Sequence, residues 1–308
     1  QNPSKTTMQY YQNKIEEQKN LDKKLNFFKD FTPTTKDKLR IKIEANVDNS
    51  EEVKLSVKKG IDGIGLYRTE YLFMNKKKMP SEDEQFNSIM KTLRYLKGKP
   101  LTIRTLDVGN DKKVPSIEKF LTKSPNPALG LRAIRLTLAF PKIFKKQISA
   151  ILRASSHGNI RIMLPMVSNV SELIETKKII NEVKFELRKT NKKIRIKSPK
   201  IGVLIETPAA ALISESLAKN CDFFAIGTND LTMYTLAIDR GDEEVAKIYD
   251  PGHLSVLKLI EMSAKSAKKN KIPISVCGEM AGDTLFTSML IGMGIRTLSM
   301  STSRILRV

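Results

Sequence analysis

The stretch FFAIGTNDLTMYTLAIDRG, residues 223–241, decides the fold class of this chain. Its apolar start, FFAI, is cut off by Gly227 and followed by Asn229 and Asp230. In parallel α/β folds, polar groups that directly follow a buried strand lie at the end of the sheet where ligands bind. A carboxylate at that place suits a hard divalent cation, and Arg240 suits a phosphate or a carboxylate. The alternative is that Asp230 only caps a helix that follows the strand.

The same rhythm of a short apolar run followed by a helical pattern repeats along the chain. Strands that alternate with helices predict parallel βαβ units, and eight such units match an α/β fold of the (β/α)8 TIM barrel type. An open, doubly wound sheet is the alternative, because the number of strands does not prove closure. The eight expected strands span residues 41–47, 63–69, 101–107, 160–166, 201–207, 223–229, 274–280 and 297–301.

The two ends of the chain differ from this repeat. Residues 1–38 include a charged helical stretch at 9–30 with a thin apolar stripe, so we expect a helical linker ahead of a barrel domain at 39–308. The sequence ends at Val308, shortly after the eighth strand, so we expect the barrel to lack its final helix. The long insertion that begins at Gly109 has a length that is usually functional.

Composition excludes several classes of protein. With 40% hydrophobic residues, the chain can bury a sizeable core, but it has no apolar run long enough for membrane insertion. Its two cysteines, Cys221 and Cys277, form neither a disulfide framework nor a zinc pattern, which favours a reducing, cytoplasmic setting. The net charge of +21 favours anionic partners. Its lysines are scattered and no nucleic-acid motif is present, so we expect no nucleic-acid site.

Polar residues follow several of the predicted strands, and a barrel would bring them to one rim. They are Arg68, Arg104, Glu206, Asp230 and Cys277. Two carboxylates on neighbouring strands suit Mg²⁺, which takes one or two protein carboxylates and leaves its other positions to water and substrate. Arginines there suit a multiply anionic, phosphorylated ligand. The sequence therefore predicts a metal-dependent site for a small phosphorylated substrate.

Each of these residues also has a purely structural alternative. An arginine at a strand end can form an ion pair with Glu70 or Asp107, and Cys277 can be a buried thiol. Five independent groups on one rim favour a shared functional site over unrelated contacts. His157 and His253 both lie in turn-like sequence, and we expect them to be ordinary loop residues.

Seven segments together resemble a known family. They are GIGLYRTEYLFM (63–74), MPSEDEQF (79–86), IRTLDVGNDK (103–112), NPALGLRAIR (126–135), IETPAAA (205–211), FFAIGTNDLTMYTLAIDRG (223–241) and CGEMAGD (277–283). In this order they resemble Enzyme I, the phosphoenolpyruvate (PEP)–protein phosphotransferase of the bacterial sugar phosphotransferase system. The helical stretch before them resembles the linker that joins the two halves of that enzyme.

The resemblance implies a reaction and partners. Enzyme I moves the phosphoryl group of PEP to its own histidine and then to the carrier protein HPr, and it releases pyruvate. Its barrel half binds PEP and Mg²⁺ and forms a homodimer. The half that carries the histidine is absent from this sequence, and neither His157 nor His253 matches it. We therefore expect this chain to be incomplete as an enzyme on its own.

The resemblance also implies roles for single residues. Glu206 and Asp230 would bind Mg²⁺, and Cys277 would protonate C3 of the enolate as pyruvate forms. The substrate-binding residues would be Arg68, Arg104, Lys112, Arg132, Asn229, Asp230 and Arg240.

Two alternatives share parts of this pattern. Pyruvate phosphate dikinase and PEP synthase are similar around several of the same segments, although RTLDVGNDK (104–112) favours Enzyme I. A barrel that binds PEP without turnover is the other alternative.

Overall fold

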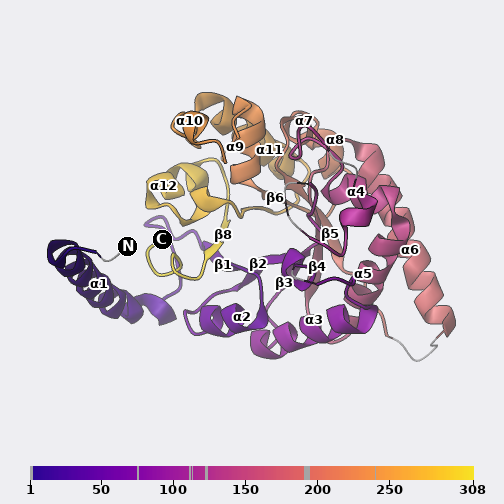
Figure 1. Cartoon of the computed structure of the whole chain (residues 1–308), viewed down its shortest axis with the longest axis horizontal. Coiled ribbons are helices and arrows are strands. Elements are labelled where there is room, and N and C mark those ends of the chain that lie inside the picture. Colours follow the sequence, from indigo (N-terminus) through magenta and orange to yellow (C-terminus); the bar gives the residue numbers. More distant parts are fainter. Residues whose placement is uncertain are drawn as a thin grey trace.

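The protein forms a closed barrel of eight parallel strands (Figure 1). A computed structural model describes residues 3–74, 76–110, 112, 114–121, 124–190, 195–239 and 241–308. Strands pair in sequence order, and β8 pairs with β1 through the partners Lys42–Thr297 to Asn46–Ser301. The predicted TIM barrel is therefore confirmed, and the open sheet is excluded.

All eight expected strands are present. Six of the expected ranges ran one to four residues too far at the carboxyl end, because the polar residues there leave the sheet. The observed strands are β1 Lys42–Val47, β2 Gly63–Arg68, β3 Leu101–Arg104, β4 Ile160–Leu164, β5 Lys200–Ile205, β6 Phe223–Ile226, β7 Ile274–Val276 and β8 Thr297–Ser301.

Helices surround the barrel (Figure 1). No helix in the described part of the chain is long and apolar enough to cross a membrane. The α-helices are α1 Lys5–Leu25, α2 Ser50–Val57, α3 Glu82–Leu96, α4 Ala133–Ala139, α5 Pro141–Ala154, α6 Val170–Thr190, α7 Pro208–Leu212, α8 Ser214–Ala218, α9 Thr228–Leu236, α10 Glu243–Ala246, α11 Leu254–Lys269 and α12 Thr284–Gly292. Single 3₁₀ turns are η1 Asn26–Asp30, η2 Glu70–Leu72, η3 Glu118–Phe120 and η4 Glu279–Gly282.

Local sequence explains where several helices begin. Asn49 caps α2 by accepting hydrogen bonds from the main-chain N–H groups of the two residues after Ser50. Ser81 and Glu84 form a capping box at the start of α3, in which each side chain bonds the other residue's N–H. After β5, the chain forms two short helices, α7 and α8, with a break at Ile213.

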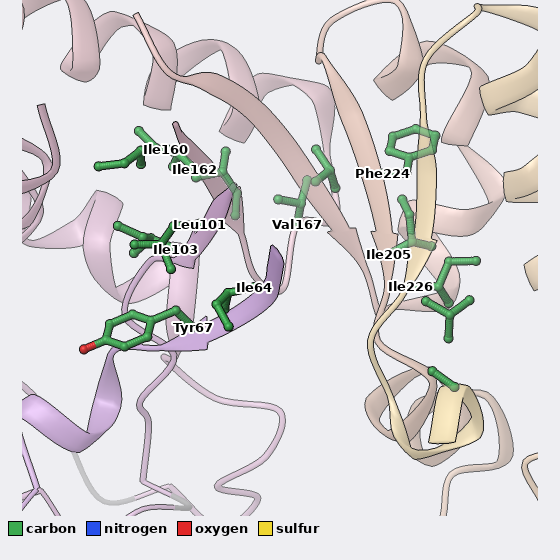
Figure 2. Close-up of a cluster of buried hydrophobic side chains, with 14 of the residues drawn as sticks. Ile64, Tyr67, Leu101, Ile103, Ile160, Ile162, Val167, Ile205, Phe224 and Ile226 are labelled. Carbon is green, nitrogen blue, oxygen red and sulfur yellow. The ribbon is translucent and has the colours of Figure 1, made fainter. Parts of the chain in front are cut away.

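The main core lies between the strands and the helices. Outward-facing strand residues such as Tyr67, Leu101 and Ile103 are fully buried there (Figure 2). Full burial of each such side chain contributes roughly 1.5–3 kcal/mol. A separate cluster forms the central plug inside the barrel. It consists of Leu66, Met163, Leu204, Phe223, Ala225 and Cys277.

Residues 302–308, after the last strand, form turns. These turns cover the barrel beside α2. The hydroxyl groups of Ser56 and Thr302 hydrogen-bond at 2.7 Å, and Lys59 Nζ donates to the Thr302 carbonyl at 3.0 Å. Ile305 is buried in the main core. These residues thus pack onto the closed barrel.

Helix α1 projects from the barrel (Figure 1). Its apolar side chains, including Tyr10, Tyr11 and Ile15, are exposed, which agrees with the thin apolar stripe in the sequence. Arg307 donates a hydrogen bond to Gln18 and so links α1 to the turns after β8.

Candidate active site

A cavity of about 790 Å³ opens at the carboxyl ends of the strands, and we call it the mouth cavity. It is lined by all eight predicted site residues that the structure describes. These are Arg68, Arg104, Lys112, Arg132, Glu206, Asn229, Asp230 and Cys277. Arg240, the ninth, lies outside the described residues. The structure therefore brings these eight side chains to one cavity, and their chemical roles stay predictions.

A buried cluster of alternating charges forms one wall of the mouth cavity. Arg104 contacts Glu70 and also Asp107, the latter at 3.1 Å. Arg132 contacts the other oxygen of Asp107 at 2.8 Å, and Lys112 lies 3.1 Å from Glu70. The ion pairs expected as a structural alternative are thus real. They do not exclude a functional role, because the same residues line the cavity.

The charged groups of this cluster shift one another's pKa values. Burial by itself would lower the pKa of Arg104, but the carboxylates of Glu70 and Asp107 raise that pKa above its usual range. Burial would likewise raise the pKa of Asp107, but Arg104, Arg132 and Lys112 hold it well below its usual range. Both groups therefore stay charged over the physiological range of pH.

The cluster also leaves hydrogen-bonding capacity unused. Arg104 Nε and Glu70 Oε2 are both buried, and neither has a hydrogen-bond partner among the described residues. An unmade bond of a buried polar atom costs about 1–3 kcal/mol. Unsatisfied groups of this kind are common where a protein binds a ligand.

Glu206 and Asp230 line the same cavity, and Asp230 lies 3.9 Å from Arg132 of the cluster. Glu206 follows β5 and accepts a hydrogen bond from the Met166 N–H at 2.6 Å. Burial, followed by repulsion from Asp230 and Asp107, raises the pKa of Glu206 well above its usual range. The negative charges of these two carboxylates repel each other, and a bound cation would relieve that repulsion.

The helix-cap interpretation of Asp230 is wrong. Helix α9 begins at Thr228, its N-cap is Gly227, and the cap makes no side-chain hydrogen bond. Asp230 lies within the first turn, where its charge is favourable without capping. Arg132 Nη2 lies 3.9 Å from Asp230 Oδ2.

The donor set fits Mg²⁺ better than a transition metal. The described residues contain no group of three or more His, Cys, Asp or Glu side chains arranged around a metal. Mg²⁺ requires only one or two carboxylates and keeps its remaining positions for water or substrate oxygens. Burial and the nearby carboxylates raise the pKa of Glu206 although Arg104 and Arg132 act against them, and a divalent cation there would favour its charged form.

The rim residues make weaker contacts. Arg68 pairs with Asp48 at 3.1 Å, but both side chains are about 40% exposed (42% and 39%), so the pair contributes little to stability. Asn229 donates to Glu279 at 3.2 Å and accepts from the Glu279 N–H at 2.8 Å. Arg68 can therefore exchange its partner for a ligand, whereas Asn229 is held in one orientation.

Cys277 lies at the floor of the mouth cavity, in the residue after β7. Its thiol is 3% exposed, and its sulfur lies 3.6 Å from the carbonyl oxygen of Ile226. Burial, followed by the charge of Glu206, raises the pKa of Cys277 to about 12. Burial also raises the pKa of Cys221 to about 12, but Cys221 does not line the mouth cavity. Both thiols are therefore protonated at neutral pH. They differ in position, because Cys277 lines the mouth cavity and Cys221 does not.

A close backbone approach fixes the position of Cys277. A Cβ atom on the next residue, Gly278, would lie 1.9 Å from the Thr228 hydroxyl oxygen. Glycine is therefore required where the end of β7 meets the start of α9.

Sequence reasoning missed two residues that hold the charged cluster. Gln147, buried on α5, accepts from the Leu106 N–H at 2.8 Å and donates to the Thr69 hydroxyl at 3.2 Å. Thr69 in turn donates to the Arg104 carbonyl at 2.9 Å. The signal in the sequence was a single glutamine among the apolar positions of an amphipathic helix.

Tyr234 is the second residue missed. It donates to the Ala128 carbonyl at 2.6 Å and accepts from Arg132 at 3.3 Å. It thereby ties α9 to the long insertion. Its neighbour Asp239 also lines the cavity, and only its position beside Arg240 could have indicated this.

Comparison with known proteins identifies the family. A family model described as "PEP-utilising enzyme, PEP-binding domain" matches residues 22–308. The chain belongs to the PEP-utilising enzymes. Among curated relatives, PEP-protein phosphotransferase of Priestia megaterium is 42% identical over 87% of this chain and 46% of its own length. That of Borreliella burgdorferi is 39% identical over 100% of this chain and 53% of its own length.

The predicted resemblance to Enzyme I is therefore confirmed, and the chain matches the C-terminal half of these relatives. It spans about half the length of the curated relatives it matches. Among solved structures, an HpcH/Hpal aldolase/citrate lyase family protein from Burkholderia cenocepacia J2315 has a TM-score of 0.53 at 13% identity. The match covers 87% of this chain and 90% of that one. That likeness shows the barrel fold alone.

Proposed function

We propose that this chain is the PEP-binding, Mg²⁺-dependent part of a PEP–protein phosphotransferase. The observation that carries the proposal is the mouth cavity. It combines four cationic side chains with a pair of carboxylates, in a chain about 40% identical to enzymes of that name. The reaction needs such a site, because a phosphoryl group in transfer requires neutralisation of its charge more than covalent help.

The cationic residues bind and orient PEP. Arg68 and Arg104 contact the phosphate, and Lys112 and Arg132 lie close enough to complete its neutralisation. Asn229 binds the ligand near the carboxylate, together with Arg240. Because the carboxylates of the buried cluster already hold Arg104 and Arg132, these side chains need little rearrangement when the substrate arrives.

Glu206 and Asp230 hold the metal ion. When bound, Mg²⁺ supplies positive charge to the oxygens of the substrate. The two carboxylates come from the ends of adjacent strands, and burial keeps water from competing for Glu206. The raised pKa of Glu206 would then fall, since the ion stabilises its charged form.

Cys277 acts as the proton donor. As the bond between phosphorus and the enol oxygen breaks, the electron pair remains on that oxygen. A carbonyl then forms there, and C3 takes the proton of the Cys277 thiol, which gives pyruvate. The resulting thiolate recovers a proton from water. A pKa of about 12 keeps the thiol protonated and ready before the reaction.

The remaining steps require parts outside this chain. The phosphoryl group passes to a histidine on another half of the protein and then to HPr. Residues 1–38 act as the linker to that half, and the barrel at 39–308 forms a homodimer in the cytoplasm. His253 is not the acceptor, because it caps α11 by accepting from the Ser255 N–H. His157 packs against Phe86, away from the mouth cavity.

Calorimetry with PEP or oxalate tests the proposal. We expect binding to the chain with Mg²⁺ and none after chelation of the metal. Glu206→Gln should abolish Mg²⁺-dependent binding, and the exposed control Glu186→Gln should retain it. Binding that does not depend on Mg²⁺, or no binding to a folded sample, would contradict the assignment.

A turnover assay separates the alternatives. Pyruvate should be released only when a histidine-bearing half of a PEP-protein phosphotransferase is supplied. Binding without turnover under those conditions would favour the non-catalytic module. Turnover only with the histidine domain of a dikinase or a PEP synthase would favour those enzymes.

A further inference from the structure

A second cavity, of about 1010 Å³, opens at the other end of the barrel, and we call it the base cavity. It lies at the amino ends of the strands, and the proposed reaction does not use it. Its lining includes Lys42, Glu44, Arg161, Lys197, Lys200 and Phe223.

An ion pair inside the barrel fixes the direction of the lining side chains. Arg161 on β4 lies 2.7 Å from Glu44 on β1, and Glu44 is buried. Because β1 and β4 are not neighbours in the sheet, this contact can form only across the barrel interior. Both side chains therefore point inward, into the base of the barrel.

Strand register places two lysines on the same inward face. Lys42 is two residues before Glu44 on β1, and side chains two apart on a strand point the same way. Lys200 on β5 is the direct partner of Arg161 on β4, so it shares that face. The two ammonium groups thus lie at the opening of the base cavity. Lys197, just before β5, adds a third to the lining.

The base cavity carries excess positive charge. Its lining holds four cationic side chains and two carboxylates, Glu44 and Asp62. Glu44 pairs with Arg161, and Asp62 pairs with Arg40 at 2.5 Å. Across the part of the chain that the structure describes, no ion pair is recorded for the three lysines. Arg161 Nε is buried there without a hydrogen-bond partner.

We propose that the base cavity binds a small polyanion that carries two or more phosphate groups. Three ammonium groups around one opening suit several negative charges better than one. The volume lies at the upper end of the range for small-molecule sites. The wall also offers apolar surface from Phe223 and three prolines: Pro100, Pro199 and Pro273.

The base ligand is separate from the substrate of the mouth. The central plug divides the two cavities: Phe223 lines the base cavity, whereas Leu66, Leu204 and Cys277 line the mouth cavity. Reaction chemistry in such barrels takes place at the carboxyl ends of the strands. The base cavity is therefore a binding site without turnover.

Calorimetry in the presence of a chelator tests this site, because the Mg²⁺-dependent site at the mouth then binds no ligand. The probes are inorganic tripolyphosphate and adenosine triphosphate, which carry similar charge. We expect the wild-type chain to bind, and the double variant Lys42→Gln/Lys200→Gln to bind about tenfold more weakly, a difference of about 1.4 kcal/mol. Tighter binding of the nucleotide would show use of the apolar wall, and equal binding would show that phosphate alone is recognised.

Matched variants make the test specific. Lys178→Gln/Lys189→Gln on the exposed face of α6 removes the same charge and should leave affinity unchanged within about twofold, or 0.4 kcal/mol. Arg104→Gln in the mouth should also leave it unchanged. Circular dichroism confirms that each variant is folded. Absence of binding to the wild type, equal loss in both lysine pairs, or loss in Arg104→Gln would overturn the proposal.

Discussion

The mouth cavity and the base cavity of this barrel are both lined by arginine, lysine and carboxylate side chains, but in different proportions. Each cavity contains an arginine paired with acidic side chains: Arg104 pairs with Glu70 and Asp107, and Arg161 pairs with Glu44. Among described lining residues, the mouth has five carboxylates and four cationic side chains, whereas the base has two carboxylates and four. The negative excess at the mouth suits a divalent cation together with an anion. The positive excess at the base suits an anion alone.

Burial differs as well. Arg104 and Asp107 at the mouth are 8% and 2% exposed, while Arg161 at the base is 23% exposed. Breaking a fully buried ion pair is costly, because the remaining charge has no access to water. The comparison therefore predicts that mutations at the mouth cost more than equivalent mutations at the base.

The largest effect is expected for Asp107→Ala. This change removes one of the two carboxylates that pair with Arg104 and the 2.8 Å partner of Arg132. It should lower the free energy of unfolding by about 3–5 kcal/mol in a urea titration. Asp239→Ala, an exposed carboxylate of the same cavity, should stay within about 0.5 kcal/mol of the wild type. If the two variants lost similar amounts of unfolding free energy, the buried cluster would be no more important for stability than the exposed rim.

The contribution of Asp107 to the free energy of unfolding should decrease as the pH falls. Its pKa is lowered in the folded protein, so its contribution is present above the ordinary pKa of an aspartate. It is lost as the pH falls, because the unfolded state takes up the proton first. The difference in stability between the wild type and Asp107→Ala should therefore narrow below about pH 4.

Cys277→Ala should reduce catalysis rather than binding. With the histidine-bearing half supplied, pyruvate release should fall about 10²-fold or more, since a positioned proton donor is lost. Affinity for PEP with Mg²⁺ should change by less than about twofold. Cys221→Ala, outside the mouth, is the control and should retain full activity. A large loss of affinity in Cys277→Ala would indicate that the thiol is structural.

Gln147→Leu tests whether residues behind the mouth hold its charges in place. The variant leaves the Leu106 N–H without its acceptor and should cost about 1–3 kcal/mol of unfolding free energy. Gln9→Leu on the exposed helix α1 serves as the control and should have little effect. An unchanged stability for Gln147→Leu would show that this amide does not support the cluster.

The smallest loss of stability is expected at the base. Glu44→Ala removes the partner of Arg161, whose side chain still reaches water, so the cost should be about 1–2 kcal/mol. The measurement is the same urea titration. A cost equal to that of Asp107→Ala would contradict the proposed difference between the two ends of the barrel.

The sequence predicted what depends on local pattern. Alternating strands and helices gave the barrel, and polar residues after strands gave the mouth, because parallel strands must bring their carboxyl ends together. It did not reveal Gln147 or Tyr234, since their partners lie 41 to 106 residues away in the chain. The base cavity was hidden for the same reason. Lys42 and Lys200 were two of many scattered lysines until register placed them on one inward face.

Closure of the barrel also has a consequence for how the protein is made. Lys42 pairs with Thr297, 255 residues further along the chain. During synthesis, one edge of β1 therefore stays unpaired until the eighth and last strand has left the ribosome. Contacts at such separation form slowly, and an exposed strand edge can pair with other chains in the meantime. The yield of folded protein should thus depend on chaperones that shield the first strand until the eighth arrives.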